Sequence, residues 1–127
     1  MDEDYVSFET AKLLKEKGLL VSLINIEDWL FSMYDTEGKI RYGCFSTDWY
    51  PRITLQMACK WLREVHNIYI SIQPDFPSEE NYKMFWCWFA STIHKNCINS
   101  KAYQCYIETY EQALESAIKY SLENLIK

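Results

Sequence analysis

The segment YKMFWCWFAS, residues 82–91, places five aromatic rings in ten positions and constrains the fold more than any other stretch. Alternate residues of a β-strand share a face, so Trp86 and Trp88 are expected on one side and Phe85 and Phe89 on the other. Because both sides are apolar at the centre, the segment predicts a central strand that needs cover on both faces.

Three other segments have the apolar periodicity of amphipathic helices. Each follows a Ser or Thr that can cap it, and the first two end at a residue type that tolerates a left-handed backbone. The predicted helices are residues 8–17, between Ser7 and Gly18; residues 55–66, between Thr54 and Asn67; and a C-terminal helix after Thr109, which begins a T-x-x-Q capping box. The predicted buried stripe of the second helix is Leu55, Ala58, Cys59, Leu62 and Val65.

Short alternating runs bounded by turn residues predict the strands. The tetrapeptide DTEG, ending at Gly38, predicts a hairpin turn. Residues 19–28 are either another strand or an irregular segment. The hairpin strands are predicted within residues 29–34 and 39–45, and the others at 68–73, 82–93 and 102–107, with a break at Tyr50-Pro51 and a turn at 94–100.

These elements predict a two-layer α+β fold with a mainly antiparallel sheet of about four or five strands. Three helices would pack largely on one face, in the order α-β-β-α-β-β-β-α. A chain of 127 residues, 49% of them apolar, can bury a core without metal or disulfides. No stretch has the composition of a linker, so we expect a single domain over residues 1–127.

Charge and targeting signals narrow the possible functions. The net charge of −5 disfavours a general nucleic-acid binder. The acidic start is unlike a secretory leader, and no segment has the apolar length of a membrane helix. The five cysteines form no CxxC pair, which indicates reduced thiols. We therefore expect a cytoplasmic protein.

Three interpretations of the aromatic segment remain open. The rings are core covered by loops, a surface for self-association or a protein partner, or a platform on which a single-stranded nucleic acid or another flat ligand stacks. Residues 81–107 contain no Asp or Glu and three lysines, which keeps the third interpretation open. The candidate surface residues are Tyr82, Lys83, Trp86, Trp88, Lys95 and Lys101.

Signals for catalysis or metal binding are weak. His94 and Cys97 have the spacing of half a metal site, to which Cys87 or Cys105 would have to be added by the fold. Cys59 and His66 lie about two helical turns apart, too far for a catalytic dyad. The common phosphate-binding, acyl-transfer and zinc-protease motifs are absent. We therefore assign no catalytic residue and expect no cofactor.

Three segments resemble a family of short uncharacterised proteins of Bacteroides-type gut bacteria and their phages. They are YVSFETAKLLKEKG (5–18), TLQMACKWLREVHNIYISI (54–72) and YIETYEQALESAIKYSLENLIK (106–127), a little under half of the chain. The resemblance implies a phage or prophage origin in a bacterial cytoplasm and carries no functional residue. We expect a small interaction module that binds itself or a protein partner through an aromatic sheet surface.

Overall fold

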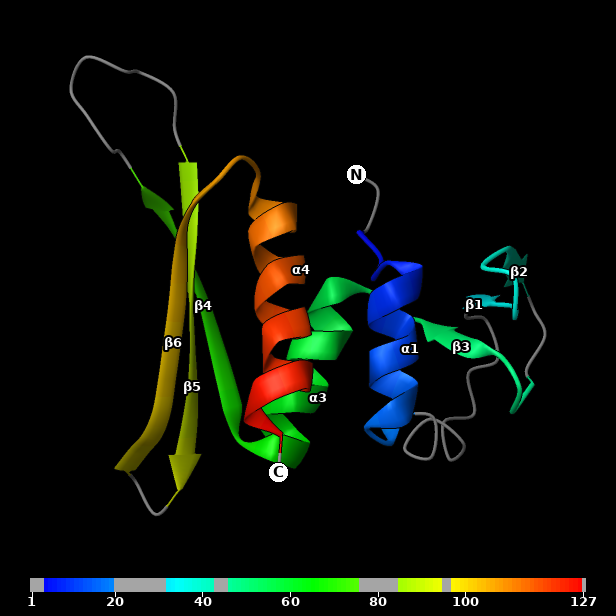
Figure 1. Cartoon of the computed structure of the whole chain (residues 1–127), viewed down its shortest axis with the longest axis horizontal. Coiled ribbons are helices and arrows are strands. Elements are labelled where there is room, and N and C mark those ends of the chain that lie inside the picture. Colours follow the sequence, from blue (N-terminus) through cyan, green and yellow to red (C-terminus); the bar gives the residue numbers. More distant parts are fainter. Residues whose placement is uncertain (1–3, 20–31, 43–45, 76–84, 95–96, 127) are drawn as a thin grey trace. The chain divides into compact units, whose positions relative to one another are not determined.

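The computed structural model describes residues 4–19, 32–42, 46–75, 85–94 and 97–126 (Figure 1). For Asp75, His94 and residues 97–101 it describes the backbone alone. The chain divides into two compact units, residues 1–58 and 59–127, and each is described by itself. Single-domain organisation therefore stays a prediction.

The first unit contains α1 (Phe8–Glu16) and a sheet of three short strands in the order β2-β1-β3. These strands are β1 (Ser32–Tyr34), β2 (Ile40–Tyr42) and β3 (Tyr50–Arg52), and both pairings are antiparallel. Ser7 caps α1 as predicted, since its hydroxyl accepts a hydrogen bond from the Thr10 N–H at 3.3 Å. The Phe8 ring contacts the rings of Tyr34 and Tyr50 edge-on, so aromatic packing joins α1 to this sheet.

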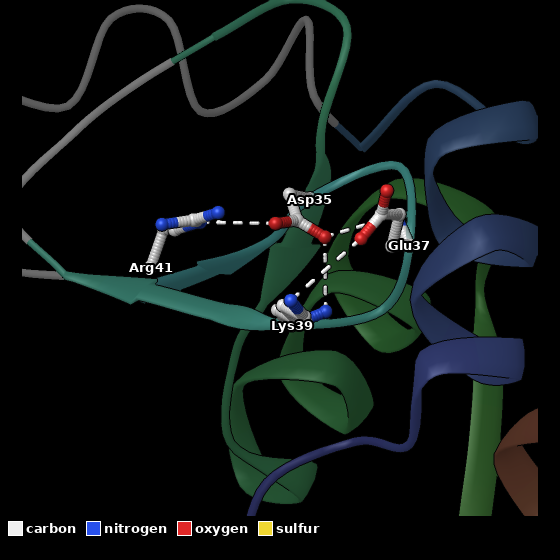
Figure 2. Close-up of polar contacts among 4 residues, drawn as sticks. All are labelled: Asp35, Glu37, Lys39 and Arg41. Atoms are coloured by element: carbon white, nitrogen blue, oxygen red, sulfur yellow. Dashed lines mark hydrogen bonds and ion pairs between the residues drawn. The ribbon is translucent and has the colours of Figure 1, made fainter.

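The predicted hairpin turn is present between β1 and β2, with Gly38 at φ +86°. The buried carboxylate of Asp35 accepts hydrogen bonds from the backbone N–H groups of Glu37 and Lys39 and from Nε of Arg41, each at 2.9 Å (Figure 2). Burial alone would raise the pKa of Asp35, but these donors stabilise the charged form and lower it. This carboxylate fixes the turn, and both of its oxygens accept hydrogen bonds.

The second unit contains a larger antiparallel sheet in the order β4-β5-β6. Its strands are β4 (Ile68–Asp75), β5 (Phe85–His94) and β6 (Cys97–Ile107). The aromatic segment forms the central strand of this sheet, as predicted. Pro74 lies on the edge strand β4. Proline has no N–H to donate to a ladder and is tolerated in edge strands.

The last helix, α4 (Tyr110–Tyr120), packs on one face of this sheet and continues into the π-helical turn η1 (Ser121–Leu125) (Figure 1). Thr109 caps it as predicted, accepting a hydrogen bond from the Gln112 N–H at 3.1 Å. Ala113 and Ala117 are fully buried against Trp88 and Ala90 of β5. Small side chains on the helix therefore leave room for the indole beneath it.

The α+β class, the predicted helices and the antiparallel pairing are confirmed, but the single sheet of four or five strands is replaced by two three-stranded sheets in the described residues. The short strand β3, at the predicted Tyr50-Pro51 break, belongs to the first of these sheets. The predicted turn at 94–100 is shorter, because β6 begins at Cys97. Residues 20–31 lie outside the described residues, so the choice left open for 19–28 stays open.

Helix α3 (Leu55–His66) has the predicted cap and end, because the hydroxyl of Thr54 accepts from the Met57 N–H and Asn67 has φ +56°. Its stripe needs one correction. Val65 is 53% exposed, whereas Trp61 is 8% exposed. Trp61 offers the larger apolar area to the core, so burying its ring stabilises the fold more than burying valine would.

Candidate functional site

The second sheet presents a face of tyrosines and phenylalanines on the side opposite its contacts with α4. The register places Ser71, Phe89 and Tyr103 side by side, each one residue along its strand from a position that packs on the helix, so these three lie on the opposite face. We call this surface the tyrosine face and define it by Tyr69, Ser71, Gln73, Phe85, Cys87, Phe89, Ser91, Tyr103 and Tyr106.

The tyrosines are the outermost rings of this face. Tyr103 is 69% exposed and Tyr106 is 66% exposed, while Tyr69 is 42% exposed. Each of the first two contacts a phenylalanine of the central strand across the β5–β6 pairing. Tyr103 stacks on Phe89 and Tyr106 meets Phe85 edge-on, with ring centroids 6.1 Å apart in both pairs. The phenylalanines thus support tyrosines that are themselves open to solvent.

Cys87 lies in the centre of the tyrosine face and is only 7% exposed. Its thiol donates a weak hydrogen bond to the carbonyl oxygen of Gln73, with the sulfur 3.6 Å from the oxygen. This small side chain lies between two larger rings of the same strand face. The thiol is therefore a buried part of the tyrosine face.

The middle of the face is free of formal charge, and the register places one charged residue of each sign at its ends, because Asp75 lies opposite Phe85 and Lys101 lies opposite Ser91. Residues 68–74, 85–93 and 102–107 contain no Asp, Glu, Lys, Arg or His. The polar groups of the face are the hydroxyls of Tyr and Ser and the amide of Gln73, and each of these can both donate and accept a hydrogen bond. The surface therefore combines exposed aromatic area with polar groups that fit many partners.

A β-bulge in β6 shapes one end of the face. Trp88 is opposite Gln104 and Trp86 is opposite Ile107, so β6 holds one more residue than β5 between these two pairs. Tyr106, within the bulge, has φ +64°. Neither Gly nor Asn marks this bulge in the sequence, so sequence reasoning missed it.

The two tryptophans of the predicted surface lie on the opposite face of the sheet. Trp88 is 2% exposed, contacts Tyr120 of α4 and donates from its indole N–H to the Gln104 side chain at 3.3 Å. Trp86 is half-buried and its ring meets that of Tyr110 edge-on. Trp88 is therefore a core residue, which agrees with the core interpretation for this ring.

The structure describes one of the remaining predicted surface residues, and only by its backbone. Tyr82, Lys83 and Lys95 lie outside the described residues, and Lys101 is described only by its backbone, opposite Ser91. The interpretation of these lysines as a basic rim stays a prediction.

The residues considered for metal binding or catalysis are only partly described by the structure. Among the described side chains, no group of three or more His, Cys, Asp or Glu residues is placed to hold a metal ion. His94 and Cys97 are opposite each other at the β5–β6 turn, but their side chains lie outside the described set. Burial raises the pKa of the Cys59 thiol to about 11, which disfavours the thiolate that a nucleophile needs. His66 packs edge-on against Trp61, with ring centroids 4.6 Å apart.

The chain matches no family model, no curated protein and no solved structure at a significant level. None of the helices in the described residues has both the length and the apolar character needed to cross a membrane.

Proposed function

We propose that the protein is an interaction module that associates with a second copy of itself through the tyrosine face. The observation that carries this proposal is the exposure of the Tyr103 and Tyr106 rings beside the half-buried Phe85 and Phe89. Aromatic residues are enriched where proteins meet, and Tyr can lose water from its ring while its hydroxyl keeps a partner.

Charge favours a second copy as the occupant. The chain carries a net charge of −5, so an interface at most places on its surface would bring like charges of two copies together. The tyrosine face carries one charged position of each sign, Asp75 opposite Phe85 and Lys101 opposite Ser91, so two such faces can meet without a net repulsion.

Hydrogen bonding favours the same occupant. In a two-fold dimer the same patch contributes to both sides, so every donor must meet an acceptor from an identical surface. Surfaces made of Lys and Arg, or of Asp and Glu, cannot satisfy that condition alone. Tyr, Ser and Gln can, because each of them donates and accepts. The tyrosine face is therefore self-complementary in polarity as well as in charge.

The resemblance to proteins of gut bacteria and their phages is the only support for the setting. We infer a phage or prophage protein that works in the bacterial cytoplasm. A self-associating module without a cofactor fits this setting, and it needs none of the catalytic motifs that the sequence lacks.

The experiment is the mass of the wild-type chain in solution by light scattering after size-exclusion chromatography, over about 1 to 200 µM, a range that covers weak specific complexes. We expect the mass to rise from monomer to dimer. Tyr103→Lys should hold the chain at the monomer mass by placing like charges in the interface. Tyr42→Lys is the matched control, because Tyr42 is 71% exposed and lies on β2.

A wild type that stays monomeric throughout, or a Tyr103→Lys variant that dimerises like the control, would overturn the proposal. For a monomeric wild type, titration of a labelled single-stranded oligonucleotide at low salt tests the stacking alternative. Saturable binding that Tyr103→Ala abolishes would then assign the face to nucleic acid, because this substitution removes a stacking ring without adding a positive charge.

A further inference from the structure

Tyr106 occupies a backbone conformation that its side chain disfavours. Two described residues other than glycine have positive φ, Asn67 at 56° and Tyr106 at 64°. Asparagine enters the left-handed region readily, and Asn67 does so where α3 ends. A bulky aromatic residue rarely does, so the conformation of Tyr106 is strained.

The surrounding fold gains little packing from the Tyr106 side chain. The residue is 66% exposed, and its ring approaches that of Phe85 edge-on. Within the bulge, the tyrosine lies on the same side of the sheet as Phe85 and extends the exposed aromatic area of the tyrosine face. A small polar residue would meet the needs of the bulge better than tyrosine does.

We propose that Tyr106 is the anchor residue of the self-association. The bulge turns its ring onto the tyrosine face, and the fold tolerates the strained backbone because the ring is buried when a second copy binds. Residues in strained conformations gather at binding sites for this reason, and a few aromatic anchors carry most of the affinity of an interface. This inference rests on the proposed function and adds the residue that supplies the affinity.

The test compares Tyr106→Asn with Tyr103→Asn, because both substitutions remove an exposed tyrosine of β6. Asparagine suits the left-handed backbone at 106 and is disfavoured in the regular strand at 103. Two quantities are measured: the dimer dissociation constant by sedimentation, and the thermal unfolding midpoint at a concentration where all variants are monomeric. Tyr106→Phe keeps the ring and serves as the conservative variant.

We expect Tyr106→Asn to raise the dissociation constant at least about tenfold, as the loss of an anchor does, without lowering the unfolding midpoint. Tyr103→Asn should lower the midpoint slightly, because asparagine fits a regular strand less well than tyrosine does. Tyr106→Phe should keep the dissociation constant within about threefold of the wild type, because the ring carries the contact.

Each contrary result has its own meaning. If Tyr106→Asn dimerises like the wild type while Tyr103→Lys is monomeric, the anchor inference is wrong and the proposed function stands. If Tyr106→Asn lowers the midpoint as much as Tyr103→Asn does, Tyr106 is a structural residue and the inference is also wrong. A wild type that never dimerises overturns both statements.

Discussion

The two faces of the central strand β5 both carry aromatic rings, but one face is covered by a helix and the other is partly open to solvent. On one face, Trp88 and Ala90 lie beneath α4 and are 2% and 0% exposed. On the other, Phe85 and Phe89 are half-buried and support tyrosines that are about two-thirds exposed. The difference does not come from hydrophobicity, because both faces carry large rings. It comes from the alanines of α4, which allow a helix to approach the indole closely. A ring's exposure therefore depends on what packs against it.

The largest loss of stability is expected from Trp88→Ala, on the face that α4 covers. Removing this buried ring should lower the free energy of unfolding by about 3–5 kcal/mol, because the cavity beneath α4 cannot close fully. Urea unfolding followed by circular dichroism measures the loss. Trp88→Phe keeps much of the ring and should lose less. A loss below about 1 kcal/mol for the alanine variant would mean that Trp88 is not part of the core.

A smaller effect is expected from overfilling the same contact. Ala117→Leu adds volume at a residue that is 0% exposed and should lower the free energy of unfolding by about 1–3 kcal/mol. The same urea titration applies. Glu111→Leu, at an exposed position in the first turn of the same helix, is the control and should cost less than about 1 kcal/mol, the contribution of a carboxylate near a helix N-terminus. Equal losses for both substitutions would contradict close packing between α4 and β5.

Removing the N-terminal cap of α4, the helix that covers Trp88, should destabilise the protein by a smaller amount. Thr109→Ala deletes the hydroxyl that accepts from the Gln112 N–H and should cost about 1 kcal/mol. Thr109→Ser or Thr109→Asp keeps an acceptor and should restore most of that loss. Stability that does not recover with either cap would show that the methyl group of Thr109, and not its hydroxyl, carries the effect.

The smallest effect on folding is expected on the tyrosine face. Tyr103→Ala removes a ring that is 69% exposed and should change the free energy of unfolding of the monomer by less than about 0.5 kcal/mol. The same substitution should weaken dimer formation in the light-scattering experiment. A large loss of monomer stability would place Tyr103 in the core and remove the contrast between the faces.

Much of the local structure could be predicted from the sequence. Ser7, Thr54 and Thr109 begin their helices, and Gly38 turns the first hairpin, because caps and turns depend on the chemistry of a few neighbouring residues. The central position of the aromatic strand also followed, since apolar residues on both faces demand neighbours on both sides.

The candidate site could be predicted only in part. Alternation separated Trp86 and Trp88 from Phe85 and Phe89, but alternation alone does not say which side α4 covers. The bulge at Tyr106 left no signal, because its sequence, QCYI, contains neither Gly nor Asn. One extra residue in a strand is decided by how its neighbours pair, and that pairing involves residues distant in the chain.

The sequence by itself determined the α+β class, the helix caps, the first hairpin turn and the aromatic centre of the second sheet, because each depends on residues close together in the chain. Only the tertiary structure decided that Trp88 is core, that Tyr103 and Tyr106 are exposed, and that the strands form two sheets. The first two of these outcomes depend on where Ala113 and Ala117 meet β5 and on the register of β6. Contacts between distant residues, which short-range patterns do not specify, set both.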